Sequence, residues 1–209
     1  MGHMTTDTKQ KLIQTALELI WKSSYGSVSV DDICKASDVK KGSFYHFFPS
    51  KVDLAIAAME ESHGIMKPLY DGIFSPATPP LKRFERLAEF IFEKQAEAAA
   101  KYGRVCGCPC ASLASEMSGQ EEGIRKKFED VAFRQELYYE NAIRDMMAEN
   151  LLPKTIDVKV KAQEVYAYIL GQLMIARIQN DLSPLKRDLS VGLLRTLGVT
   201  IKSPEVDAV

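Results

Sequence analysis

Three of the chain's four cysteines fall within five residues, in the stretch VCGCPCAS at residues 105–112. Cysteine thiolates bind metal ions, form disulfides, react with electrophiles or act as catalytic nucleophiles. A zinc site normally needs a fourth ligand, and Cys34 and His63 lie far away in the sequence. A disulfide between cysteines this close would be strained and labile, and a nucleophilic cysteine needs a neighbouring base, for which we find no convincing candidate. The sequence therefore favours no metal, no cofactor and no enzymatic role.

Two interpretations of these cysteines stay open. Free cysteine is among the most frequently buried residue types, so the three side chains could fill space or line a ligand pocket. Pro109 suits the first turn of a helix, which would place Cys108 and Cys110 near a helix N-terminus. The helix dipole there lowers the pKa of a thiol and raises its reactivity, so Cys108 is also a candidate sensor of reactive molecules.

The bulk composition limits the classes to which the chain can belong. Its 209 residues are 46% hydrophobic, which is enough for a substantial core. A formal net charge of −1 gives no overall attraction to nucleic acid, so any such binding needs a local positive patch. We find no secretory signal and no apolar run long enough for a membrane span, and expect a cytoplasmic protein with reduced thiols. Residues 1–3, before Met4, look like a cloning remnant.

The elements that must position the cysteines are predicted to be helices. Apolar residues recur at helical spacing through most of the chain and strand signals are sparse, so the fold class is all-α. Gly26 is expected to cap the first helix in a left-handed conformation, and the stretch FSPATPP at residues 74–80 separates a compact N-terminal part from a larger helical part. About nine helices are expected, at residues 7–24, 30–36, 40–47, 51–66, 81–101, 107–118, 121–150, 158–181 and 185–197.

The stretch SVSVDDICKASDVKKGSFYHFFPSKVDL, residues 27–54, predicts the most specific local structure. Ser29 and Asp32 have the spacing of a capping box and start a short helix. A second short helix begins at Lys40 or Lys41 and puts Phe44 and Phe48 on its buried side. Two short helices joined by a tight turn and packed on a longer first helix form a helix-turn-helix.

The distribution of charge around the second short helix favours nucleic-acid binding. Residues 39–51 contain three lysines and one histidine but no acidic residue. This is where a recognition helix would meet phosphates and base edges in a major groove. Any single lysine here is better explained as an ordinary solvated side chain. The whole arrangement predicts a DNA-binding surface, and binding should weaken steeply with salt as counterions are released.

The stretch VDDICKASDVKKGSFYHFFPSKVDL resembles the DNA-binding segment of the TetR family of bacterial repressors, and the resemblance is specific over about residues 8–62. It implies a three-helix DNA-binding domain at residues 4–50 and a larger effector-binding and dimerisation domain at residues 51–209. It departs from the family at Lys40, where a Ser or Thr cap is frequent. Carried over by position, the resemblance implies DNA-contact residues at Ser29, Lys40, Lys41, Gly42, Ser43, Tyr45, His46 and Lys51.

The C-terminal part suggests a dimer and an effector site. The predicted helix at residues 158–181 is apolar almost all round, which fits the family's pairing of its last two long helices into a homodimer. The stretch GCPCASLASEM, residues 107–117, resembles a TetR-family group in which a cysteine recurs at the position of Cys108 and some members respond to electrophiles or oxidants. The candidate effector or sensor residues are Cys106, Cys108, Cys110, Phe90, Lys94, Glu116, Met117 and Tyr166.

Taken together, the sequence predicts a cytoplasmic, homodimeric transcriptional repressor without enzymatic activity. Its partners would be a pseudo-palindromic double-stranded DNA operator and a small-molecule or electrophile effector, with no membrane involved. Release from DNA would follow effector binding or thiol modification. The alternatives are a cysteine-dependent redox enzyme and a metal-binding helical protein. Whether Cys108 reacts or lines a pocket, and whether the protein represses or activates, is left open by the sequence.

Overall fold

The computed structural model describes residues 2–199, with side chains from residue 7 onward. Met1, part of the predicted cloning remnant, lies outside the described residues. Within them the chain forms nine α-helices and no strand, so the predicted all-α fold is confirmed. The helices are α1 (Gly2–Lys22), α2 (Val30–Ser37), α3 (Lys41–Phe47), α4 (Lys51–Ile73), α5 (Pro80–Tyr102), α6 (Pro109–Met117), α7 (Glu122–Ala148), α8 (Val158–Gln179) and α9 (Ser183–Leu197).

Local capping residues explain where the N-terminal helices begin. The hydroxyl of Ser29 accepts from the backbone N–H of Asp32 at 3.1 Å, and the Asp32 carboxylate accepts from the Ser29 backbone at 2.9 Å. This is the predicted capping box. Ser50 accepts from the backbone N–H of Asp53 at the start of α4 in the same way. Lys40 makes no side-chain capping bond at the start of α3, as expected for a residue with no acceptor.

The predicted cap of the first helix and the predicted end of the fourth helix are wrong. The first helix ends at Lys22, and Gly26 is not among the described glycines with a positive φ, so Gly26 does not cap it. The fourth helix continues through Pro68 to Ile73, although the prediction ended it at residue 66. The next turn buries Tyr70 and Phe74, whose rings stack with centroids 6.1 Å apart. The packing of these two rings outweighs the backbone hydrogen bond that Pro68 removes.

The chain divides into two compact units, and each unit combines two separate segments of the sequence. The first unit contains the described residues up to Leu69 together with Cys106–Arg134. Its core includes Leu12, Ile33, Phe44 and Ile124, all fully buried. Helices α1, α2, α3 and α6 therefore belong to one unit, and the helix opened by the cysteines packs with the helix-turn-helix. The predicted domain boundary after residue 50 falls inside this unit.

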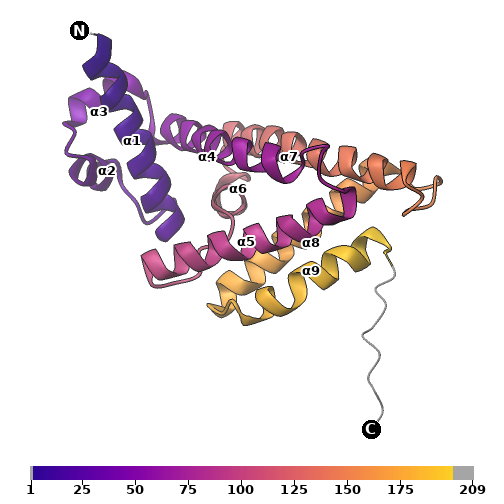
Figure 1. Ribbon diagram of the computed structural model, residues 1–209. Helices are drawn as coiled ribbons and strands as arrows, with labels where there is room; N and C mark the ends of the chain where they lie inside the picture. Colours follow the sequence, from indigo (N-terminus) through magenta and orange to yellow (C-terminus); the bar gives the residue numbers. More distant parts are fainter. Residues whose placement is uncertain (1, 200–209) are drawn as a thin grey trace. The chain divides into compact units, whose positions relative to one another are not determined.

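The second unit contains Tyr70–Val105 and the described residues from Gln135 onward. In it α8 and α9 lie side by side (Figure 1). Its core is rich in aromatic rings: Phe74 and Phe84 pack edge-on against each other, and both are tilted against the fully buried Tyr139. Arg83 is almost completely buried; it donates to the carbonyl of Thr78 at 2.8 Å and pairs with Asp145 at 2.5 Å. These contacts fix the start of α5 against α7.

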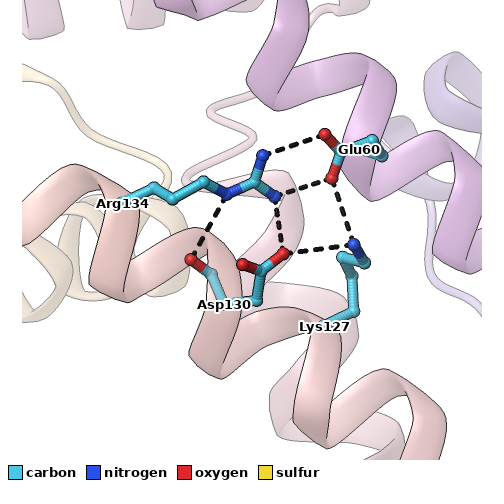
Figure 2. A network of polar contacts seen from close by, with 4 residues as sticks. All are labelled: Glu60, Lys127, Asp130 and Arg134. Atoms are coloured by element: carbon cyan, nitrogen blue, oxygen red, sulfur yellow. Dashed lines mark hydrogen bonds and ion pairs between the residues drawn. The ribbon is translucent and has the colours of Figure 1, made fainter.

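A network of charged side chains joins α4 to α7 inside the first unit (Figure 2). The carboxylate of Glu60 accepts two hydrogen bonds from the guanidinium of Arg134, at 2.6 and 2.9 Å, and a third from Lys127 at 3.1 Å. Asp130 pairs with both cations, at 2.7 and 3.2 Å. The hydrogen bonds from Arg134, followed by those from Lys127, lower the pKa of Glu60 from 4.5 to about 2.

The lowered pKa of Glu60 gives a testable pH dependence. The stabilisation is complete above the unfolded-state pKa of 4.5 and is lost as the pH falls towards about 2, since the unfolded carboxylate takes up its proton first. We expect Glu60→Gln to lose less stability than the wild type between about pH 6 and about pH 3, measured by urea unfolding. Glu149→Gln, which removes an exposed carboxylate just after α7, is the matched control. Parallel pH profiles for wild type and Glu60→Gln would contradict this account.

Candidate nucleic-acid interface and thiol segment

Helix α3 presents its polar residues on one side because its aromatic residues are buried on the other. Phe44 and Phe48 are buried in the core of the first unit, as predicted. Tyr45 is 51% exposed, and Lys41, Gly42 and His46 are exposed beside it, with Ser43 half-buried. Ser29 at the start of α2 and Lys40 at the start of α3 are also exposed. The structure thus brings seven of the eight predicted DNA-contact residues to accessible positions on α2 and α3 or at their starts.

Lys41 is available for exchange with an anionic partner. Its ammonium lies 2.8 Å from the carboxylate of Asp31, and both side chains are more than half exposed. The hydrogen bond to Asp31 raises the pKa of Lys41, so the side chain stays cationic. An exposed ion pair of this kind contributes little to stability because water screens it. A phosphate could therefore replace Asp31 as the partner of Lys41 at small cost.

Lys51 occupies a different environment from the other predicted contact residues. Its ammonium donates to the carbonyl of Tyr25 at 2.6 Å and lies 3.8 Å from the centroid of the Tyr25 ring. The side chain is half-buried, and burial lowers its pKa, with Glu116 and Asp32 opposing that shift. Lys51 thus ties the start of α4 to the α1–α2 turn, residues 23–29. Its role as a DNA contact stays a prediction.

The thiol segment, residues 106–110, leads into α6 and is anchored to α1 and α4. Cys106 and Cys110 are buried, and Cys108, the residue before α6, is half-buried. The indole N–H of Trp21 donates to the carbonyl of Gly107 at 2.8 Å. The Ser62 side chain hydrogen-bonds Cys110. All four cysteines lie within the described residues and are thiols, and no group of three His, Cys, Asp or Glu side chains there is placed to hold a metal.

A small cavity lies beside Cys110 within the first unit. It holds about 10 Å³, roughly the room of one water molecule, and its walls are almost entirely apolar. The lining residues come from α1, α4 and α6: Leu17, Ile20, Trp21, Ala58, Met59, Pro109, Cys110 and Leu113. The cavity lies where α6 packs against α1 and α4.

The structure contradicts the expectation that the helix dipole makes these thiols acidic. Burial raises the pKa of Cys108, and the backbone N–H groups of Ala111 and Cys110 oppose this only in part. Burial also raises the pKa of Cys110, and the hydrogen bond from Ser62 again opposes it. Desolvation of a thiolate in an apolar site outweighs a helix N-terminus that supplies only a few N–H groups. Both groups are neutral thiols at neutral pH.

We therefore expect Cys108 and Cys110 to be alkylated much more slowly in the native protein than in urea at about pH 8. The reactive thiolate forms only above the raised folded-state pKa values. For the same reason, stability should fall as the pH rises above about 8.5, where unfolded thiols lose protons that the folded state retains. Iodoacetamide labelling followed by mass spectrometry of each cysteine measures the rates. Native Cys108 reacting faster than the unfolded chain would restore the acidic-thiol interpretation.

The predicted effector or sensor residues are divided between the two units. Glu116 and Met117 lie on α6 in the first unit with the three cysteines, whereas Phe90, Lys94 and Tyr166 lie in the second. Phe90 packs edge-on against Tyr70, with centroids 6.0 Å apart. Lys94 pairs with Glu97 at 2.7 Å, and Tyr166 is buried. The second unit also buries the hydroxyl of Tyr139, 3.3 Å from Gln135, a polar pair that sequence analysis missed.

Glu116 makes a long-range contact that its position in the sequence did not predict. Its carboxylate accepts hydrogen bonds from the backbone N–H groups of Tyr25 and Gly26, at 2.9 and 2.7 Å. These partners lie about ninety positions earlier in the chain. No local pattern signals the contact, since it depends on how α6 packs on α1. It joins the thiol-bearing helix directly to the α1–α2 turn.

Two family models match the chain. One, described as "Bacterial regulatory proteins, tetR family", matches residues 12–58, which span the helix-turn-helix. The other, described as "Tetracyclin repressor-like, C-terminal domain", matches residues 84–190, about half of the chain. No described helix is long and apolar enough to cross a membrane.

Individual relatives agree with these matches. An HTH-type transcriptional regulator from the lacX 3′ region of Lactococcus lactis subsp. lactis is 29% identical over 194 residues, covering 91% of this chain and 92% of the relative. The HTH-type transcriptional repressor NemR of Escherichia coli K12 is 22% identical over 188 residues, covering 90% and 93%. Among solved structures, the regulatory protein TetR from Rhodobacter sphaeroides aligns with a TM-score of 0.77 at 28% identity, covering 90% and 96% of the two chains. A regulator from Agrobacterium tumefaciens aligns with a TM-score of 0.81 at 21% identity, covering 94% and 100%.

Proposed function

Since the chain belongs to the TetR family of bacterial transcriptional regulators and carries the family's DNA-binding helix-turn-helix, we propose that it acts as a homodimeric repressor. It binds a pseudo-palindromic operator through α3 and is released by a small molecule or by modification of a thiol. The proposal includes a cytoplasmic location and no catalytic role. The observation that carries it is the surface of α3, where Lys41, Tyr45 and His46 are exposed opposite the buried Phe44.

Helix α8 supports the dimer. It exposes Val160, Ile175 and Ile178 to solvent, and Ile178 is 75% exposed. Ala167 and Gly171 are also exposed on α8, so a second copy could approach closely. An exposed apolar stripe on a helix is typical of a protein interface. The replacement Ile178→Asp should therefore shift the protein from dimer to monomer in analytical ultracentrifugation.

The protonation state of the thiols affects which route could release the protein from its operator. A thiolate is the reactive form of cysteine, and burial keeps Cys108 and Cys110 protonated. This favours a reversible small molecule over covalent modification as the effector. Whichever acts, it must bind the DNA-competent and DNA-free states with different affinities. Treating the operator complex with a quinone and comparing wild type with Cys108→Ser separates the two routes, because only covalent release requires that thiol.

The proposed repressor function is tested by selecting bound sequences from a random DNA library with the purified dimer. We expect a pseudo-palindromic site to be enriched, with half-sites about one helical turn apart. Binding to it should fall steeply with salt. A library from which no sequence is enriched would contradict the proposal. Metal analysis and thiol-substrate turnover assays of the same preparation test the metal-binding and redox-enzyme alternatives.

A further inference from the structure

Helix α6 packs on the DNA-binding part of the chain through apolar side chains and also reaches it through one carboxylate. Glu116, near the end of α6, accepts hydrogen bonds from the consecutive N–H groups of Tyr25 and Gly26. We propose that Glu116 is a positioning residue for DNA binding, which holds the α1–α2 turn so that α2 and α3 take the orientation that fits the operator. The inference rests on the proposed DNA-binding function and adds the residue that couples α6 to it.

The α1–α2 turn is held at Tyr25, whose backbone N–H and carbonyl groups both form hydrogen bonds to charged side chains. The N–H of Tyr25 donates to Glu116 at 2.9 Å, while its carbonyl accepts from Lys51 at 2.6 Å. The Lys51 ammonium also lies over the Tyr25 ring. Both bonds are charge-assisted, which makes them stronger than hydrogen bonds between neutral groups. The backbone at Tyr25 is thereby fixed between α6 and the start of α4.

The space around Gly26 shows how close this contact is. A Cβ atom added at Gly26 would lie 2.8 Å from the Oε1 atom of Glu116, a distance that real Cβ contacts do not show. Gly26 has no positive φ, so its backbone conformation does not require glycine. Because the Oε1 atom is the end of a flexible side chain, a methyl group at Gly26 would push the Glu116 carboxylate aside. Gly119, just after α6, has open space around the same position.

The position of the turn determines the position of the recognition helix. Three residues after Gly26, Ser29 caps α2, and α2 packs on both α1 and α3. A shift of the turn therefore carries α2 and α3 with it. At its other end α6 follows the thiol segment, which Trp21 holds through the carbonyl of Gly107. A ligand or modification that displaces the thiol segment would move α6, and with it Glu116.

The experiment compares operator and random-sequence affinities of Glu116→Gln, Gly26→Ala and the double variant. Glutamine keeps the shape of the side chain, but its NH₂ group faces one of the two N–H donors and cannot accept from it. Alanine at Gly26 pushes the carboxylate away without changing any charge. We expect each single change to weaken operator binding about tenfold, comparable to one mismatched base pair, and to leave random-sequence binding unchanged. Adding Gly26→Ala to Glu116→Gln should cost much less than it does alone, because the contact is already broken.

Two controls and the opposing results complete the test. Gly119→Ala and Glu122→Gln change a glycine and a carboxylate nearby without touching the turn, and should bind the operator as the wild type does. Wild-type affinity in both single variants would overturn the inference, as would strictly additive losses in the double variant. An equal loss of operator and random-sequence binding, accompanied by a lower Tm, would also overturn it, because it would indicate a general structural role. If the wild type selects no operator at all, the proposed function fails instead.

Discussion

Replacing Lys41 and Tyr45 together with alanine is expected to weaken operator binding about a hundredfold, since each contact to a phosphate or base typically contributes about tenfold or more. Stability should change little, because Tyr45 is 51% exposed and the Lys41–Asp31 pair is open to water. The two residues sit one helical turn apart on α3, so both face the same surface. Fluorescence anisotropy with the selected operator measures the affinity, and thermal unfolding measures the stability.

The salt dependence of binding makes this experiment more specific. Removing a lysine that neutralises one phosphate should reduce the slope of log affinity against log salt by about one unit. Lys126→Ala removes a lysine that is even more exposed than Lys41, but on α7, and should change neither affinity nor slope. If the double variant kept wild-type affinity and slope, α3 would not be the recognition helix.

Phe44→Ala should destabilise the first unit by about 3–5 kcal/mol, the usual cost of removing a fully buried phenylalanine side chain. Phe44 packs against Phe48 and Tyr45 and lies in the same core as Ile124 on α7. The cavity left by the missing Phe44 ring would therefore weaken a core that the helix-turn-helix shares with α6 and the beginning of α7. Operator binding should be lost together with the fold of this unit.

The chain's single tryptophan allows the unit to be followed separately. Trp21 lies on α1 in the first unit, so its fluorescence reports on that unit, while far-UV circular dichroism reports on all helices. In Phe44→Ala, the urea midpoint seen by fluorescence should fall more than the midpoint of the remaining circular dichroism signal. Phe133→Ala removes a ring that is 52% exposed and should have little effect. Equal losses in the two variants would mean that the core around Phe44 is not what stabilises the unit.

The helix-turn-helix could be predicted from sequence because its signals are local. The Ser29–Asp32 capping box, the Ser50 cap and the buried Phe44 and Phe48 all depend on spacings of three or four residues, and all are confirmed. The family resemblance over the same stretch is confirmed as well. The end of α4 could not be predicted because the helix continues past Pro68 only through the packing of the Tyr70 and Phe74 rings. That packing depends on the tertiary structure.

The thiol segment shows why the rest of the site could not be predicted. Helix position alone suggested an acidic Cys108, whereas its pKa depends on residues that bury it from elsewhere in the chain. The role of Glu116 depends on partners at Tyr25 and Gly26, and the grouping of α6 with α1 rather than with α5 is a long-range property. Patterns within one stretch of sequence carry no information about such contacts.

Pro68 has a mechanical consequence for α4. Proline has no N–H, so the carbonyl four residues earlier, at Gly64, loses its partner within the helix, and both residues are exposed to water. The missing bond lies two residues before the point where the chain passes from the first unit to the second. The bending stiffness of α4 is therefore lowest close to that junction, while the hydrogen-bond ladders on either side stay rigid. A force that bends α4 would therefore bend it first at Pro68.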